Sequence, residues 1–532
     1  MDVDLCIRGG RVVDGTGSAS HEADVALRDG RIFAVEPRLD HLNAARTIDA
    51  TGCVVAPGFI DIHTHSDVSL LHDPRGESKV LQGVTTEVIG NCSFSAFPID
   101  RSRLSLHRDH LARLGDKPIT PTWTDLDGYA AVLEDEGIAV NVAPLLGHGT
   151  LRVAAMGLAD RRPTAQEQAR MLALASEMFS QGAFGFSTGL THVPSAYAEP
   201  SEIEAIAAVA ARQGRIYATH ARAKAGFTFA AIDEAIDVGR RTGVRVQFSH
   251  VAINEPNLWG RARDVIEVFE RARADGVDIA YDVYPYDASC SSLTQYLPAW
   301  LQEGGTAAMV DRLTDPDVRD RALEELSAGW FGGIPWHWDR VIVSRAGPGA
   351  ESCVGRSIED VAAAERRLPA VVALDLCERY GNEVEVVLHY RTEGDMLAFL
   401  RHSLAIVGSD GSAIPFDQGV DLPHPRHFGT FPRVLGRYVR ERGALGLEEA
   451  IAKMTSAPAD RVRLPNRGRL EQGYAADVVV LDAQIVRDNA TFENPAQAPT
   501  GIRDVIVNGV PVVMAGHQTN ARPGRVLRAS DA

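Results

Sequence analysis

The sequence predicts an α/β protein whose main body is a (β/α)8 TIM barrel, with a β-sandwich built from both chain termini and an inserted lid subdomain between barrel strands 7 and 8. Short apolar runs alternate with helical patterns through the middle of the chain, as in a parallel sheet with crossover helices. Both chain ends instead read as short strands and tight turns. With 532 residues, 45% of them hydrophobic, the chain can bury a large barrel and a second body.

The two chain ends share one pattern of strands and turn dipeptides. The N-terminal stretches are LCIRGGRVVDG (5–15), ADVALRDGRIFAV (23–35) and TIDATGCVVAPG (47–58). The C-terminal stretches are GYAADVVVLD (473–482) and IRDVIVNGVPVVMAG (502–516), in which NG and AG mark turns. We therefore expect residues 1–56 and 461–532 to form one β-sandwich.

The barrel is predicted over residues 57–460, where eight apolar runs match the strand number of a (β/α)8 fold. In chain order they are FIDIHTH (59–65), TTEVIGNC (85–92), VNVAPLLGHG (140–149), AFGFSTGL (183–190), IYATHAR (216–222), VRVQFSHV (244–251), DIAYDVYPY (278–286) and LAIVGSDG (404–411). In such barrels the chemistry lies at the C-terminal ends of the strands. The residues that end these runs are therefore the first candidates for a functional site.

A long segment separates the seventh run from the eighth. A structureless loop of this length would contradict the barrel assignment. The segment is patterned instead, with helical stretches around 306–328 and 357–380 and strand candidates in DRVIVSRAG and VEVVLHY. We expect residues 290–400 to form an inserted lid subdomain.

Composition excludes several classes of partner. The formal net charge is −17, from 54 basic and 71 acidic side chains, so nucleic acid is not expected as a partner. No apolar run reaches the roughly 18 residues of a membrane helix, and MDVDLCIRGG lacks the basic head of a signal peptide, so we expect a cytoplasmic protein with no membrane partner. The six cysteines show no paired short spacing, which argues against a disulfide framework. The oligomeric state stays open, a homo-oligomer included.

Reactive residues end five of the eight runs. His63 and His65 end the first, Cys92 the second, His220 the fifth, His250 the sixth and Asp410 the eighth. In IDIHTH the apolar and polar residues alternate, so the two histidines point to one face of the strand. Each histidine alone is more often a structural or capping residue, but their shared placement indicates a metal site.

The ligand types favour zinc. Imidazole and thiolate suit this borderline-soft ion, and Cys92, His220 and His250 could supply three ligands while one position stays open for water. An ionised Asp410 would take a proton from the water that the metal activates and later deliver it to a leaving nitrogen. The alternatives are a small core residue for Cys92 and a helix N-cap for Asp410, and the neighbouring ligands make both less favoured.

The same positions resemble the amidohydrolase superfamily of metal-dependent hydrolases. Finer motifs resemble its N-acyl-D-amino-acid deacylase (D-aminoacylase) branch over nearly the whole chain. They are GVTTEVIGNCSFS (83–95), FSTGLTHVPSAYA (186–198), THAR (219–222), DVYPYDAS (282–289), GSDG (408–411) and HPRHFGTFPRVLGRYVRE (424–441). An HxH pair alone is a weak signal, whereas the NC box together with HPR-x-x-GTFPRVLG is strong.

The resemblance implies roles for the metal ligands. Cys92 matches the cysteine that replaces the bridging carboxylated lysine of other superfamily members. His220 and His250 match the ligands of one tight Zn²⁺ site. His63 and His65 match a pair whose metal is weak or absent in this branch. Asp410 would be the catalytic aspartate.

The resemblance also suggests substrate-binding residues. Tyr284, Ser289 and Arg222 fall where the branch binds its substrate's carboxylate. His148 could donate to the substrate carbonyl, and an ordinary hydrogen-bonded turn histidine is an equal alternative. Arg426 could bind substrate or form a buried pair with an acidic neighbour.

One departure concerns the carboxylate. The branch follows the sixth-strand histidine with a second histidine and a carboxylate-binding lysine, whereas this chain has Val251 and Ala252 there. Either another cation, such as Arg222, replaces the lysine, or the substrate lacks a carboxylate at that place.

The sequence thus predicts metal-dependent hydrolysis of N-acyl-D-amino acids or related small N-acyl amines. Hydrolysis of a cyclic amide, a dipeptide or a carboxylate-free amide on the same site is the alternative. A catalytically silent assembly protein is disfavoured, because such relatives lose ligands and here all of them are present.

Overall fold

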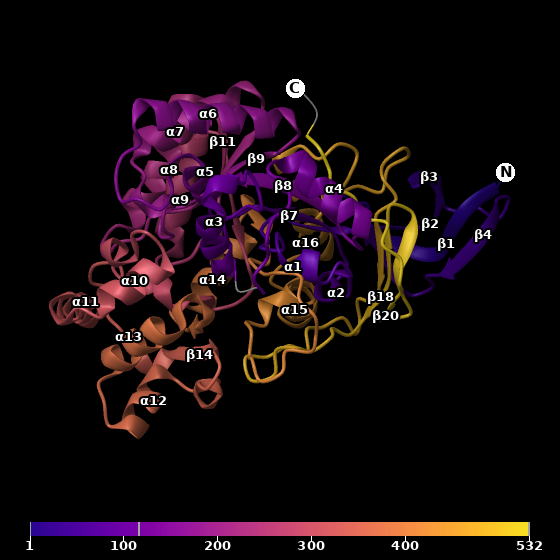
Figure 1. The fold of residues 1–532 in the computed structure, drawn as a ribbon. Coiled ribbons are helices and arrows are strands. Elements are labelled where there is room, and N and C mark those ends of the chain that lie inside the picture. Colours follow the sequence, from indigo (N-terminus) through magenta and orange to yellow (C-terminus); the bar gives the residue numbers. More distant parts are fainter. Residues whose placement is uncertain (1, 115–116, 530–532) are drawn as a thin grey trace.

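The computed structural model describes residues 2–114 and 117–529. Its central element is a parallel eight-stranded sheet in which each barrel strand pairs with the next along the chain (Figure 1). The strands are β6 (Phe59–Asp61), β7 (Val84–Ile89), β8 (Asn141–Gly147), β9 (Gly185–Gly189), β10 (Ile216–His220), β11 (Arg245–Phe248), β12 (Ile279–Val283) and β16 (Ala405–Val407). A parallel bridge between Thr64 and Gly411 joins the first and last strands just beyond their ends. The predicted barrel is therefore confirmed.

Helices cover the outside of the barrel because each presents an apolar face to the strands. In α9, Val265, Ile266 and Phe269 are buried while the intervening charged residues are exposed or half-buried. The helices are α1 (Ser69–His72), α2 (Glu77–Val80), α3 (Leu104–Leu111), α4 (Leu126–Glu136), α5 (His148–Met156), α6 (Ala165–Ser180), α7 (Pro200–Arg212), α8 (Thr228–Thr242), α9 (Ala262–Ala274), α14 (Glu393–Arg401), α15 (Arg426–Arg433), α16 (Leu447–Met454) and α17 (Ser456–Val462). None of the helices in the described part of the chain is long and apolar enough to cross a membrane.

Strands from both chain ends form a second body. They are β1 (Asp2–Val12), β2 (His21–Arg28), β3 (Arg31–Glu36), β4 (Asn43–Asp49), β5 (Val54–Pro57), β17 (Val478–Leu481), β18 (Ile502–Val507), β19 (Val510–Met514) and β20 (His517–Gln518). β5 pairs antiparallel with β17, and β1 pairs with β2, β4 and β5, so the strands form one sheet that branches at β1. Leu5, Val25 and Val478 share its core. The body predicted from both termini is confirmed, while the domain boundaries stay predictions.

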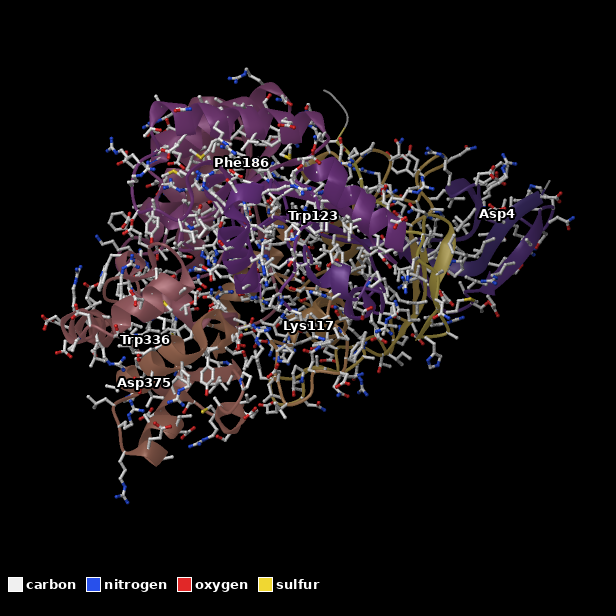
Figure 2. The ribbon with its side chains drawn as sticks, viewed as in Figure 1. Asp4, Lys117, Trp123, Phe186, Trp336 and Asp375 are labelled. Carbon is white, nitrogen blue, oxygen red and sulfur yellow. The ribbon has the colours of Figure 1, made fainter. Side chains whose placement is uncertain are left out.

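The long segment between the seventh and eighth barrel strands folds as a unit, here called the inserted subdomain (residues 289–388). Its antiparallel sheet has the order β13 (Ser289–Ser292), β15 (Glu385–Leu388), β14 (Val341–Arg345). Around it lie α10 (Thr306–Leu313), α11 (Pro316–Ala328), α12 (Ile358–Glu365) and α13 (Pro369–Tyr380). The subdomain has its own apolar core, and it lies beside the barrel at the lower left of Figure 1. Figure 2 shows side chains filling the barrel around Phe186 and the subdomain around Trp336.

Candidate metal centre and active site

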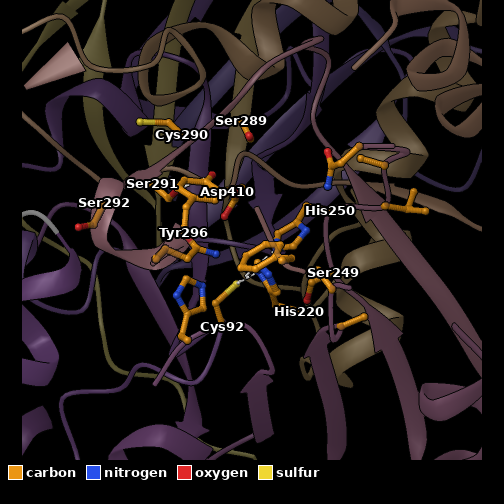
Figure 3. A pocket seen from close by; sticks show the side chains of 18 of the residues that line it. Cys92, His220, Ser249, His250, Ser289, Cys290, Ser291, Ser292, Tyr296 and Asp410 are labelled. Atoms are coloured by element: carbon orange, nitrogen blue, oxygen red, sulfur yellow. Dashed lines mark hydrogen bonds between the residues drawn. The ribbon is translucent and has the colours of Figure 1, made fainter. Parts of the chain in front are cut away.

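The ends of the barrel strands bring the predicted metal ligands together. Two groups of ligand atoms form, and within each group the atoms lie within 4.8 Å of one another. One group contains Cys92, His220 and His250, and the other contains His63, His65, Cys92 and Asp410. Cys92 belongs to both groups, so its thiolate could contribute to either of two ion positions. Figure 3 shows Cys92, His220, His250 and Asp410 facing one another across the cavity.

The first group has the geometry of a three-ligand site. The Cys92 Sγ lies 3.5 Å from the His250 Nε2 and 3.8 Å from the His220 Nδ1. Burial alone would raise the pKa of Cys92, but the facing His63 and His250 hold the pKa of this thiol well below its usual range. A thiolate with two imidazoles is a donor set that fits Zn²⁺ with one coordination position free.

The second group adjoins the first at Cys92. The His63 Nε2 lies 3.2 Å from the Cys92 Sγ, and the His65 Nε2 lies 3.0 Å from the Asp410 Oδ1. These donors are imidazole, thiolate and carboxylate, so they also fit a zinc ion. The structure therefore places all five predicted metal ligands and Asp410 in one centre.

Backbone strain is concentrated in this centre. Cys92, His250 and Asp410 have φ angles of +50°, +36° and +52°, in the left-handed region that residues with a Cβ rarely adopt. Each residue follows a different barrel strand, and the neighbouring Ser93 is also left-handed at +76°. Such strain persists where the surroundings hold it for a functional reason.

Asp410 is held as an ionised carboxylate. Burial would raise its pKa, but Arg426 and the nearby His250, His65 and His63 keep the pKa well below the usual value for aspartate. Arg426 donates to the Asp410 Oδ2 at 2.7 Å, which leaves Oδ1 directed toward His63 and His65. Arg426 thus forms the buried pair with an acidic neighbour that was one of its two predicted roles.

A second aspartate orients two of the ligands. Asp282, at 1% exposure, accepts from the His63 Nδ1 at 3.1 Å and from the backbone N–H of His250 at 2.7 Å, both at Oδ1. Its Oδ2 accepts from the Gln247 Nε2 at 2.8 Å. One carboxylate therefore fixes the ring of one ligand and the left-handed backbone of another.

A buried lysine supports the loop that carries Asp410. The Lys79 Nζ donates to the Asp61 Oδ2 at 2.9 Å, to the Ser409 Oγ at 2.7 Å and to the Gly411 carbonyl at 3.0 Å. Ser409 and Gly411 flank Asp410, so Lys79 ties this loop to the first barrel strand.

A cavity of about 230 Å³ opens beside the metal ligands. Four of the predicted substrate-binding residues line it, namely Arg222, Tyr284, Ser289 and Arg426. The phenolic oxygen of Tyr284 is buried and has no hydrogen-bond partner among the described residues. Trp330 and Phe331 extend the wall from the inserted subdomain, and Trp330 also belongs to that subdomain's core.

Two predicted substrate-binding residues hydrogen-bond to other side chains of the protein. His148 is fully buried outside the cavity, where its Nδ1 lies 2.7 Å from the Ser195 Oγ and its Nε2 lies 2.8 Å from the Glu202 Oε1. It is therefore a hydrogen-bonded structural histidine. Arg222 reaches the cavity, but it pairs with Glu234 and donates to two backbone carbonyls. Four of its five N–H donors are thus occupied by the protein.

The sequence reasoning missed Asp282, Lys79 and Arg391. Asp282 lies on the seventh strand beside a residue that was identified, so the strand-end rule could have found it. Arg391 lines the cavity from the segment after the inserted subdomain, and no sequence pattern signals this placement.

The family model described as the amidohydrolase family matches residues 46–513. The chain belongs to the amidohydrolase family. Among the amidohydrolase relatives, an N-acyl-D-glutamate deacylase of Alcaligenes xylosoxydans xylosoxydans is 37% identical over 99% of this chain and 96% of its own length. A D-aminoacylase of the same organism is 36% identical over 98% of this chain and 97% of its own.

A solved amidohydrolase structure agrees with this membership. The crystal structure of an N-acyl-D-glutamate deacylase from Bordetella bronchiseptica, complexed with zinc and a phosphonate mimic of the tetrahedral intermediate, matches with a TM-score of 0.84 and 35% identity. The match covers 99% of this chain and 100% of that chain.

Proposed function

We propose that this amidohydrolase is a zinc-dependent deacylase that hydrolyses N-acyl-D-amino acids to a carboxylate and a free D-amino acid. The observation that carries the proposal is the pair of ligand groups sharing Cys92, with an ionised Asp410 beside them at the mouth of the barrel. Relatives named for this activity cover nearly the whole chain, which supports the substrate class.

The chain's own residues supply the proton transfers. Zn²⁺ bound by Cys92, His220 and His250, with His63 and His65 as ligands for a weaker second ion, would polarise the substrate carbonyl and make water more acidic. Asp410 accepts a proton at Oδ1 from the attacking water and later gives it to the leaving nitrogen. Arg426 keeps the carboxylate ionised before the first transfer and holds it in position through both.

Arg391 is the best placed cation for the substrate carboxylate. Its Nε donates to the Asn254 Oδ1 at 3.1 Å, and the guanidinium carbon lies 4.8 Å from the Tyr284 ring centroid. Ala252, Tyr284 and Arg391 border both the main cavity and a smaller one behind it, so Arg391 neighbours the alanine that stands where the branch has lysine. A guanidinium can bind a carboxylate through two parallel hydrogen bonds.

The test compares substrates and arginine variants. Wild-type kcat/KM is measured for an N-acyl-D-amino acid, its L-enantiomer and its primary amide. We expect the D-acid to be preferred, and Arg391→Met to raise KM for the acid about tenfold to a hundredfold, the value of one charge-assisted pair. Arg340→Met is the matched control, because Arg340 also lies over an aromatic ring, that of Trp259, and does not line the cavity.

Two results would contradict parts of the proposal. A primary amide cleaved as well as the acid would indicate a carboxylate-free substrate. An acid preference that survives in Arg391→Met but is lost in Arg222→Met would move the anion site to Arg222.

We further propose a cytoplasmic enzyme that acts on small molecules without a nucleic acid or membrane partner. All six cysteines are free, which suits a reducing compartment, and the net charge of −17 does not favour nucleic acid.

A further inference from the structure

A hydrogen-bonded chain runs from the inserted subdomain to the metal ligand His220. The Thr191 Oγ1 lies 2.7 Å from the His220 Nε2. The Gln295 Nε2 donates to the same Thr191 oxygen at 2.9 Å. The three residues come from different parts of the fold, because His220 ends β10, Thr191 follows β9, and Gln295 lies in the 3₁₀ helix Leu293–Tyr296 of the inserted subdomain.

The chain engages the ring nitrogen that does not face the metal position. The His220 Nδ1 is directed toward Cys92, so a metal bound there leaves Nε2 protonated. That N–H donates to Thr191, and this contact selects the tautomer and the ring orientation. Among the described residues, Thr191 is the hydrogen-bond partner of the His220 Nε2.

Gln295 is held in place by its chain neighbours. Its neighbours Leu293 and Tyr296 belong to the core of the inserted subdomain. The adjacent Thr294 Oγ1 donates to the Asn382 Oδ1 at 2.5 Å, and the Asn382 Nδ2 donates to the Thr306 Oγ1 at 2.8 Å. Gln295 thus holds Thr191 from a rigid support.

The Gln295 amide has no other strong contact. The side chain is 6% exposed, and its Oε1 is buried without a hydrogen-bond partner among the described residues. An unpaired buried polar atom is unfavourable, so a leucine of similar volume would satisfy the local packing better. The contact with Thr191 is what this amide supplies.

We propose that Gln295 is a positioning residue of the metal centre, which orients His220 through Thr191 and so makes the inserted subdomain part of the zinc site. The inference rests on the proposed zinc-dependent function, and its primary readout is zinc affinity. A residue that hydrogen-bonds a ligand in this way typically changes metal affinity by about tenfold to a hundredfold.

The experiment measures zinc affinity by chelator competition in the full-length protein. We expect Gln295→Leu to weaken zinc binding by about tenfold or more. Gln302→Leu is the matched control, because Gln302 is a second buried glutamine of the same subdomain that donates to the Leu297 carbonyl and accepts from Arg113. Thr191→Val should weaken zinc binding similarly, and Thr191→Ser, which retains the hydroxyl, should restore it.

A double-mutant cycle distinguishes an effect through the Gln295–Thr191 contact from a general loosening of the packing. Because both residues act through one contact, the combined Thr191→Val and Gln295→Leu variant should weaken zinc binding little more than either single variant. If Gln295→Leu does not fold, Gln295→Asn, which keeps the amide but shortens its reach, takes its place.

Equal zinc affinity in the Gln295 variant and the Gln302 control, or additive losses in the cycle, would overturn the inference. These results would leave the proposed function intact, since wild-type zinc content and deacylation are measured separately. Absence of deacylation in a wild-type protein that binds zinc would instead contradict the proposed function, and it would not affect the proposed role of Gln295.

Discussion

The barrel and the inserted subdomain bury different kinds of polar side chain. The barrel buries charged groups, among them Asp61, Lys79, Glu87 and Asp282. Between residues 289 and 388, all of which the structure describes, the buried polar side chains are neutral: Ser292, Thr294, Gln295, Gln302, Ser344, Ser357 and Asn382. Burying a charge is costly unless it is paired and hydrogen-bonded. The buried charges of the barrel therefore form a network of ion pairs and hydrogen bonds, whereas the buried polar groups of the subdomain are neutral.

This difference separates the chemistry from the choice of substrate. The barrel supplies the predicted metal ligands, Asp410 and the charged side chains around them, so most substitutions there disturb several partners at once. The inserted subdomain supplies part of the cavity wall from an ordinary apolar core, which tolerates changes of shape. Apart from Gln295, which contacts the metal centre through Thr191, substitutions in the subdomain should therefore change KM, whereas substitutions in the barrel should change the rate of the reaction.

The largest expected effect is that of Cys92→Ala. This change removes the sulfur that both ligand groups share, so zinc content and deacylation should fall together, the latter by about a thousandfold or more if several kcal/mol of electrostatic stabilisation is lost. Metal analysis and kcat/KM are measured on the same preparation. Cys377→Ala is the control, because Cys377 is fully buried in the subdomain core. Full zinc content in the Cys92 variant would show that the sulfur is not a ligand.

Asp410→Asn should have the next largest effect. The amide keeps the shape of the carboxylate but cannot accept the proton, so kcat should fall at least about a hundredfold while zinc stays bound. Arg426 then faces a neutral partner, and added formate is a suitable test of rescue. A rate near that of the wild type would mean that another group transfers the proton.

The same contrast explains how far the sequence could predict the structure. The order of barrel strands follows from local hydrophobic patterns, and ligands such as His220 and Cys92 are recognisable because the ends of parallel strands meet at one mouth of the barrel. The place of the inserted subdomain also follows from the length between two recognisable strands.

The remaining features depend on contacts between distant segments. Gln295 and Thr191 are 104 residues apart, and nothing in either local sequence indicates that they meet. Arg222 is two residues after a predicted ligand and lines the cavity, but two of its donors bond to Glu234, which lies twelve residues later in the chain. Side-chain pairing across packed elements decided these cases, and one sequence does not reveal it.

Asp282→Asn should have an intermediate effect that is specific to the barrel. The two carboxylate oxygens accept hydrogen bonds from His63, His250 and Gln247. An amide has only one acceptor oxygen and cannot accept all three, so zinc affinity should fall about tenfold to a hundredfold. Chelator competition gives the affinity. Asp395→Asn is the control, since this buried aspartate accepts from the backbone of Gly260 and Ala262, and it is absent from the lining of the main cavity and from the ligand groups. Equal affinities in the two variants would show that Asp282 only supports the fold.

The smallest expected effect concerns the pH dependence of stability. We expect it to come from the buried charges of the barrel, because the buried polar side chains of the inserted subdomain are neutral. Burial raises the pKa of Glu87 from 4.5 to about 7. Lys79 alone would lower this pKa, but the neighbouring Asp61 opposes that effect. Lys79 lies 2.9 Å from Asp61 and 3.4 Å from Glu87, so this cluster is electrically balanced when one of the two carboxyl groups is protonated.

The sign of the effect follows from proton binding. Between pH 4.5 and about 7 the folded chain holds a proton on Glu87 that the unfolded chain releases. The stability that this proton contributes is fully present below the unfolded pKa and is lost as the pH rises through the folded pKa. Glu87→Gln cannot ionise, so its Tm should fall less steeply than that of the wild type between about pH 5 and pH 8.

The exposed Glu324 of the inserted subdomain provides the control, and Glu324→Gln should follow the wild-type curve. A Tm difference between Glu87→Gln and wild type that is constant over this range would mean that Glu87 does not change its protonation state there.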